Sequence, residues 1–228
     1  MSQPTAVVLS DFGSELLLNR IQNGQIEPRS KKTVNTAGRA LAENFDAAGY
    51  NYGVLAENIA TGKAIVEGSE NALTEIKDIV ERLGAACAAL EDQTDCQNMA
   101  KEIWKNVDAV LATQLGPSDT PVFDTRNNGL NLTIGEGETL KVGGINLEQN
   151  AFRALKNAVS NGSIDSSNAL DLSQKAMDQL LMEIADQGAK HKILSNRQDL
   201  YSDLTSIYHT ASDDTAKTSI SSLFSAVM

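Results

Sequence analysis

The residues that most often carry chemistry in proteins are few in this chain and lie far apart. It contains two histidines, His191 and His209, and two cysteines, Cys87 and Cys96. Zinc sites and redox dithiols require several such ligands at short spacing. Neither histidine has a second ligand at that spacing, and the cysteines are nine residues apart. We therefore expect no metal site, no redox dithiol and no cofactor.

The two cysteines differ in their sequence surroundings. Cys87 falls on an apolar position of a helical pattern, which is typical of a small buried thiol. Cys96 lies in a polar stretch that would leave it exposed. A disulfide between them would need a turn to bring them together.

Sequence patterns that could support catalysis are explained more simply by a hairpin turn and by ion pairs on a helix surface. Gly135 and Gly137 are too close together for a phosphate-binding loop and precede no helical pattern, so they indicate a hairpin turn. Acidic and basic residues near one another on a helix form solvated ion pairs; they include Glu67, Glu70, Glu75, Lys63 and Lys77. We identify no nucleophile with an adjacent base. The sequence therefore predicts no catalytic residues and no enzyme.

Charge and composition exclude further classes of function. The 228 residues carry a formal charge of −11, which opposes attraction to nucleic acid or to anionic membranes. No apolar run reaches the roughly 18 residues of a membrane span, and no cleavable signal peptide is evident. Aromatic residues make up only 4%, which favours slender helix interfaces over a thick globular core.

A seven-residue repeat of apolar and small residues runs from Gly38 to Leu90. Its first set is Gly38, Phe45, Tyr52, Ile59, Val66, Leu73, Val80 and Cys87, and its second is Leu41, Ala48, Leu55, Gly62, Ser69, Ile76, Leu83 and Leu90. Charged residues fill the positions between, so the repeat predicts a helix of about fifty residues with a coiled-coil seam. A helix of that length needs partner helices. Gly62 and Ser69 would either admit a facing backbone or be tolerated imperfections in the repeat.

The rest of the chain predicts shorter elements and one more long helix. A second helix follows the polar break at 91–95 and stops at Leu115-Gly116-Pro117. Between Pro121 and Gly144 the apolar period changes to two, which indicates a small β-hairpin. After a helical or loop stretch at 151–159, a long helix is expected from about Asn168 to about Ala211.

These elements predict a mainly α fold, a long antiparallel coiled-coil rod with a small β-hairpin region. The expected packing seam consists of Phe45, Leu55, Ile59, Val66, Leu73, Ile76, Val80, Leu83, Leu180, Ile184 and Leu204. The expected organisation is an N-terminal assembly segment at 1–34, rod helices at 35–120, the hairpin region at 121–160, rod helix at 161–211, and a C-terminal assembly segment at 212–228.

Several segments in this order resemble the bacterial flagellin family, as a short flagellin or flagellin-like protein. Arg20-Ile21-Gln22-Asn23-Gly24 is similar to the family's Arg-Leu-Ser-Ser-Gly, and Ser69–Ile76 is similar to Glu-Gly-Ala-Leu-Asn-Glu-Ile. Asn35–Gly38 occupies the place of Asp-Asp-Ala-Ala-Gly, and Ala185–Ala189 resembles Asp-Leu-Gly-Ala. The matches keep the family's order and spacing through most of the chain. The two cysteines and the short ends depart from the family pattern.

The resemblance implies a motility protein, a self-assembling structural subunit of the bacterial flagellar filament. Its partners would be copies of itself or other flagellins, together with the flagellar export apparatus and an export chaperone. The protein would be extracellular, secreted unfolded without a cleavable signal peptide.

Two alternatives remain open from the sequence. The short ends would suit a flagellin-related protein outside the main filament, either a hook-filament junction protein or a secreted flagellin-like product. A cytosolic coiled-coil adaptor with reduced cysteines would also carry long helices.

Overall fold

The computed structural model describes residues 31–115, 120–126, 128–135 and 137–224. They belong to two compact units. The central unit is Leu55–Leu200, and the terminal unit contains the described residues up to Val54 and those from Tyr201 onward. The predicted segments at 1–30 and 225–228, with the Arg20–Gly24 match, lie outside the described residues.

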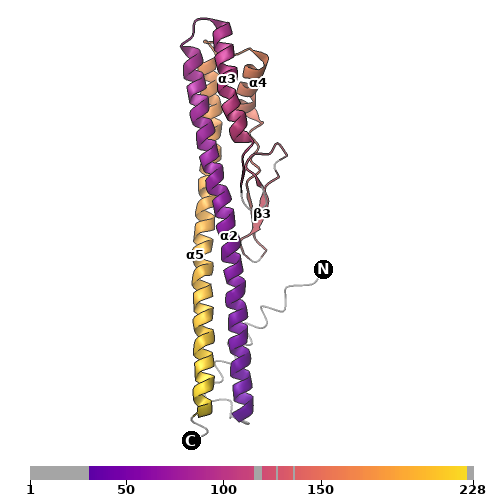
Figure 1. Cartoon of the computed structure of the whole chain (residues 1–228), viewed down its shortest axis with the longest axis vertical. Coiled ribbons are helices and arrows are strands. Elements are labelled where there is room, and N and C mark those ends of the chain that lie inside the picture. The colour runs from indigo at the N-terminus through magenta and orange to yellow at the C-terminus, as the bar shows by residue number, and fades with distance from the viewer. Residues whose placement is uncertain (1–30, 116–119, 127, 136, 225–228) are drawn as a thin grey trace. The chain divides into compact units, whose positions relative to one another are not determined.

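Helices dominate the described chain, and the strands are short. The elements in order are α2 (Lys31–Ala88), α3 (Gln93–Leu111), β1 (Gln114–Leu115), β2 (Thr120–Pro121), β3 (Leu130–Thr133), β4 (Thr139–Val142), α4 (Asn150–Asn161) and α5 (Ala169–Phe224), as Figure 1 shows. The predicted mainly α fold with long packed helices and a small hairpin is confirmed.

The two long helices extend further than their sequence patterns predicted. Helix α2 begins at Lys31, soon after Pro28, and α5 continues past Ala211 to Phe224. No glycine or proline follows Gly188 in the chain, so nothing in the sequence interrupts α5. The expected end near Ala211 was wrong because a polar stretch was taken as a helix stop.

Side-chain oxygens accept hydrogen bonds from backbone N–H groups in the first turns of α3 and α4. Asp92 is the N-cap of α3, and its carboxylate accepts from the backbone N–H groups of Thr94 and Asp95. These bonds, led by that of Asp95, hold the pKa of the Asp92 carboxyl below its usual range. Helix α4 has no such cap of its own. Instead, the Gln179 amide oxygen of α5 accepts from the Phe152 N–H at 3.0 Å.

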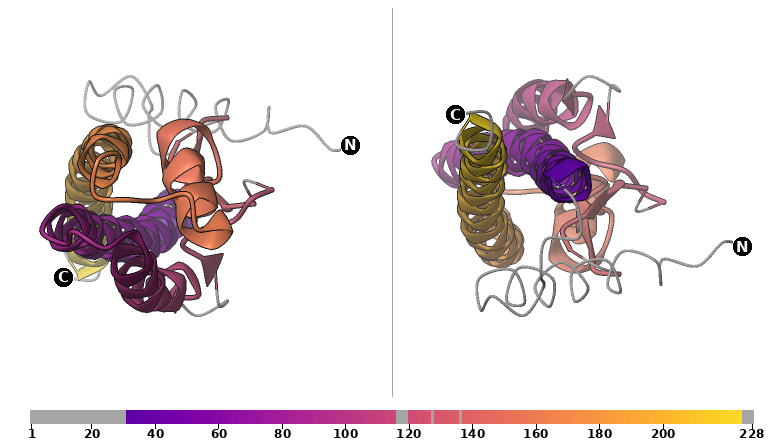
Figure 2. Two further views of the ribbon diagram at one scale, coloured as in Figure 1. Left: turned by 90° about the horizontal axis from the view of Figure 1, so that it is seen from above. Right: turned by 90° about the horizontal axis from the view of Figure 1, so that it is seen from below.

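The core of the central unit lies where α2, α3, α4 and α5 meet (Figure 2, left). Trp104 of α3 packs against Phe152 of α4 with ring centroids 5.5 Å apart. Gln97 donates to the Gly162 carbonyl just beyond α4, at 2.5 Å. Helices α3, α4 and α5 all contribute to this core beside α2. Helix α2 also buries a third row of residues, Ile65, Ala72 and Ile79, and the last two belong to this core.

The predicted hairpin is formed by β3 and β4, which pair antiparallel with Leu132 opposite Leu140. Its turn includes Gly137 at φ 74°, a backbone conformation that favours glycine. The stretch at 151–159, left open as helix or loop, is the helix α4.

In the terminal unit, α2 and α5 pack antiparallel through aromatic rings. Tyr208 of α5 lies 5.4 Å from Tyr52 and 6.1 Å from Phe45 of α2, measured between ring centroids. Tyr52 also stacks on Tyr201 at 5.8 Å. The Ser212 hydroxyl donates to the Ala42 carbonyl at 3.1 Å, which ties the helices together beyond the rings.

Candidate assembly surface

The structure buries most residues of the expected packing seam, and the buried ones lie in the central unit. Seven of the eleven have no exposed surface: Ile59, Val66, Leu73, Ile76, Val80, Leu83 and Leu180. Leu55 and Ile184 are half-buried in the same unit, as are Phe45 and Leu204 in the terminal unit. Five of the seven belong to the core that α3 and α4 also form, and Ile59 and Val66 lie outside it.

The buried face of α5 includes polar residues that the apolar pattern of the sequence did not predict. The residues it buries at seven-residue spacing are Ser173, Leu180, Gln187, Leu194 and Tyr201. Neither the Ser173 hydroxyl nor the Gln187 Oε1 finds a hydrogen-bond partner among the described residues. Glu183 is half-buried, and burial, with a further contribution from Asp186, raises the pKa of its carboxyl.

Small residues of α2 allow other elements to approach closely. A Cβ at Gly84 would lie 2.7 Å from Ser173 Cβ of α5, and one at Gly62 would lie 1.8 Å from Leu132 Cδ1 of β3. Gly62 thus receives a side chain of the hairpin, not the facing backbone that the sequence suggested. Ser69 is buried, and its hydroxyl donates to the Ile65 carbonyl within α2 at 2.7 Å.

The hairpin is held to both long helices of the central unit. Leu132 of β3, which is 7% exposed, fills the space above Gly62 of α2. At the hairpin turn, Glu138 forms an ion pair with Arg197 of α5 at 2.5 Å. These two contacts make the hairpin a bridge between α2 and α5.

The two histidines face carboxylates of α2 and not each other. His191 Nε2 lies 2.8 Å from Glu67 Oε1 in the central unit, and His209 Nδ1 lies 3.5 Å from Asp46 Oδ1 in the terminal unit. Each pair joins α5 to α2. Within the described residues, no group of three or more histidine, cysteine or acidic side chains is placed to hold a metal ion.

The expectation that Cys96 is exposed was wrong. It lies on the inner face of α3 and is fully buried, as is Cys87. The polar neighbours that suggested exposure occupy the outer face of α3, because a helix turns successive side chains to different sides. Both thiols are free.

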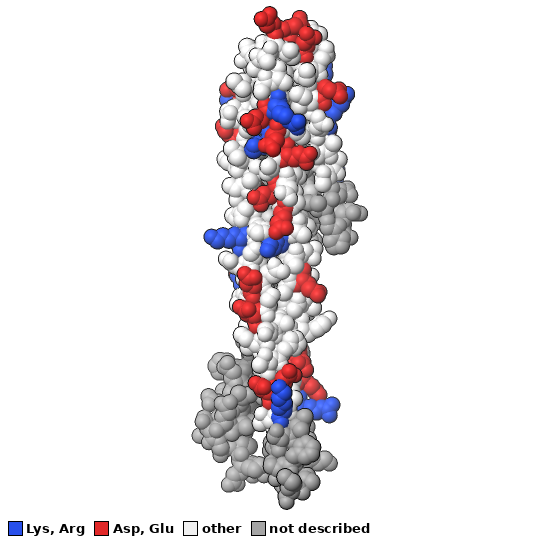
Figure 3. Space-filling model, turned by 60° about the vertical axis from the view of Figure 1, so that its left-hand side comes forward, with Lys and Arg blue, Asp and Glu red and all other residues white. Residues whose placement is uncertain are grey.

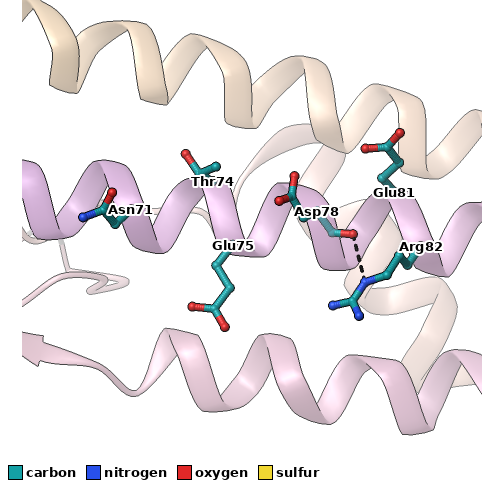
Figure 4. A pocket seen from close by; sticks show the side chains of 6 residues that line it. All are labelled: Asn71, Thr74, Glu75, Asp78, Glu81 and Arg82. Carbon is teal, nitrogen blue, oxygen red and sulfur yellow. Dashed lines mark hydrogen bonds between the residues drawn. The ribbon is translucent and has the colours of Figure 1, made fainter.

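The surface of the central unit has two hollows of different character. An open groove of about 580 Å³ is lined by α2 alone, through Asn71, Thr74, Glu75, Asp78, Glu81 and Arg82. In Figure 4 these side chains spread outward along the helix, and Arg82 donates to the Asp78 carbonyl. A hollow of about 130 Å³ has mainly apolar walls, with Asp124 and Glu148 at its edge. Neither hollow is lined by a histidine or cysteine.

Charged side chains of both signs are interspersed on the surface, and acidic ones prevail on the face in Figure 3. Many lie in neighbouring-turn pairs such as Lys175–Asp171 at 2.7 Å and Lys190–Asp186 at 2.7 Å. Among the described helices, none carries the long apolar stretch that a lipid bilayer requires.

One exposed face of α5 in the central unit carries large apolar side chains. Met182 is 67% exposed, Ile193 42% and Leu200 44%. At 3.6 residues a turn, their spacing places them within about 20° of one another around the helix axis. We call these three residues the α5 stripe. Leu170 and Leu181 are also exposed, but on a different face. The sequence interpretation assigned only Leu180, Ile184 and Leu204 of this helix to a packing seam and did not identify the stripe.

Comparisons with known proteins find likeness among solved structures. No family model matches the chain, and no curated protein matches it. A solved structure named "putative flagellar hook-associated protein", from Vibrio parahaemolyticus, is 14% identical, with a TM-score of 0.49, and the match covers 77% of this chain and 95% of that one.

Proposed function

We propose that this protein is a structural subunit of the bacterial flagellar filament. Its long helices pack laterally against copies of itself or against other flagellins. It reaches the cell exterior unfolded, through the flagellar export apparatus, with or without an export chaperone. Its role is mechanical, and no residue acts as a catalyst.

This proposal rests on the α5 stripe, which stays exposed although the interface between the long helices is already complete. In the central unit, α2 and α5 already bury their seam against each other and against α3 and α4. Met182, Ile193 and Leu200 remain outside that core. Apolar side chains aligned on one face of a helix can pack against a second helix. We propose that a second copy of the chain packs on the stripe, because it presents the same kind of helix.

The flagellin resemblance supports the same proposal from the sequence. Within the matched segment Ser69–Ile76, the buried residues Ser69, Leu73 and Ile76 belong to the α2 seam. The matched segment Ala185–Ala189 lies on α5 and contains the buried Gln187. Two of the segments that carry the resemblance therefore contribute buried residues to the paired helices.

The first test measures assembly of the purified protein at high concentration by light scattering, with electron microscopy of the products. The variant Ile193→Gln/Leu200→Gln should fold normally by circular dichroism and fail to assemble. The matched control Leu170→Gln/Leu181→Gln also replaces two exposed aliphatic side chains, on another face of α5, and should assemble. Loss of assembly in both variants, or in neither, would contradict the role of the stripe.

A second test concerns export. The protein should reach the culture medium or the cell surface only in cells with an intact flagellar export apparatus. A cytosolic coiled-coil adaptor would stay inside in both strains, and that result would exclude the proposed function.

A further inference from the structure

The turn between α2 and α3 brings the two cysteines of the chain together. Helix α2 ends at Ala88 and α3 begins at Gln93, so Cys87 lies in the last turn of one helix and Cys96 in the first turn of the next. The Cys87 thiol donates to the Cys96 carbonyl oxygen, at 3.2 Å from sulfur to oxygen. Both residues have no exposed surface.

This proximity is fixed by contacts that do not involve the thiols. The Asp92 carboxylate caps α3, and the Cys96 N–H donates to the Asp92 carbonyl at 3.1 Å. On the other side of the turn, the Leu90 N–H donates to the Cys87 carbonyl at 3.1 Å. The backbone therefore holds the two side chains in place whether or not a bond joins them.

The two thiols also influence each other. Burial raises the pKa of the Cys87 thiol to about 12, and the adjacent Cys96 thiol contributes to the rise. A thiol with such a pKa reacts slowly in the folded protein at neutral pH. Oxidation must therefore take place while the chain is folding or while the turn is locally open.

We propose that Cys87 and Cys96 form an intramolecular disulfide when the chain folds in oxidising surroundings, which joins α2 covalently to α3. The proposed extracellular location would supply such surroundings, but the pairing itself rests on the folded geometry alone. It is independent of what the protein assembles with.

The oxidant is a small-molecule disulfide such as oxidised glutathione. One cysteine thiolate attacks it, forms a mixed disulfide and releases one glutathione thiolate. The second cysteine thiolate then attacks the protein sulfur of the mixed disulfide and releases the second glutathione. The two protein thiols lose two electrons and two protons, and the oxidant is reduced to two thiols.

The test compares the equilibrium of this exchange in the native and unfolded protein. The full chain is equilibrated in buffers of reduced and oxidised glutathione, after refolding from urea or in concentrated urea. Free thiols are then alkylated, and mass spectrometry gives the fraction of chains with an internal disulfide. If the fold favours the disulfide, the equilibrium constant for its formation should be on the order of 100-fold larger in the native protein than in urea. This factor corresponds to the entropy of closing the short loop between the two cysteines.

Two further measurements make the result specific. The oxidised protein should melt about 5–10 °C above the reduced protein. The single variants Cys87→Ser and Cys96→Ser should form no internal disulfide, and their melting temperatures should not respond to glutathione. The proposal would be overturned if the equilibrium constant for disulfide formation were equal or smaller in the native protein than in urea. Disulfides formed only between chains would also overturn it.

Discussion

Replacement of Gly62 by alanine tests how the hairpin is seated on α2. At most positions inside a helix, glycine to alanine adds about 1 kcal/mol to the free energy of unfolding, because alanine loses less backbone entropy. At Gly62 the new Cβ would lie 1.8 Å from Leu132 Cδ1 and 3.2 Å from Leu132 Cγ. The Leu132 side chain must therefore move.

The magnitude follows from what Leu132 loses when it moves. It is almost fully buried, and overpacking a buried site costs about 1–3 kcal/mol. With a cost near 2 kcal/mol and a helix gain near 1 kcal/mol, Gly62→Ala should lower the free energy of unfolding by about 1 kcal/mol. In a Leu132→Ala background the clash disappears, so the same substitution should raise it by about 1 kcal/mol.

The assay is a double-mutant cycle from urea unfolding, followed by the fluorescence of Trp104. This tryptophan is buried in the core of the central unit and reports the unit that contains both residues. The coupling free energy between Gly62 and Leu132 should be about 2 kcal/mol. Gly188→Ala is the matched control, because an added Cβ there meets no described atom within 4 Å, and it should stabilise. A Gly62→Ala variant as stable as the control, with coupling below about 0.5 kcal/mol, would refute the reasoning.

Four further predictions concern the packing of the long helices and the helix cap at Asp92. Leu73→Asp places a charge at a position with no exposed surface and should lower the free energy of unfolding by about 3 kcal/mol or more, whereas Thr74→Asp on the exposed face should change it little; unchanged helicity and melting of the first would contradict the seam register. Gln187→Leu should stabilise by about 1–2 kcal/mol in urea unfolding, because it removes a buried oxygen that finds no donor among the described residues. Glu183→Gln should raise the melting temperature at pH 7 and not at pH 4: burial raises the folded pKa, so ionisation above the unfolded value destabilises the wild type only at the higher pH. For Asp92 the folded pKa lies below the unfolded value. Its carboxylate therefore stabilises the folded protein above about pH 4, and this stabilisation is lost as the pH falls through the folded pKa. Melting curves from pH 7 to pH 2 should show Asp92→Ala less stable than the wild type at neutral pH and equal to it in strong acid.

Regular patterns made part of the fold predictable. The seven-residue repeat of α2 could be identified because its apolar positions recur without interruption from Ile59 to Cys87. The hairpin could be identified because the period of two around Leu132 ends at a glycine turn. Both signals are local, and they depend on a single periodicity in one stretch of chain.

What the sequence did not predict depends on contacts between distant segments. The third buried row of α2 at Ile65, Ala72 and Ile79 is not specified by the two sets of the repeat, and Ala72 and Ile79 pack in the core that α3 and α4 also form. Cys96 is buried in the same core. In α5 the buried face also holds polar residues such as Gln187, and hydrophobicity alone does not place such residues inside.

The packing role of Gly62 also could not be predicted from the sequence. A glycine at a seam position fits both a close contact and a tolerated imperfection, and only the position of Leu132 distinguishes the two. The α5 stripe could have been found from the spacing of Met182, Ile193 and Leu200, once the inward face of α5 was known.

The most direct test of the account is immunogold electron microscopy of intact cells that naturally produce this protein, with a strain that lacks it as the negative control. We predict gold label along the flagellar filaments. Label confined to the filament base would instead identify a junction protein. Absence of label from every part of the flagellum, in cells that contain the protein, would contradict the proposal that it is a flagellar structural subunit.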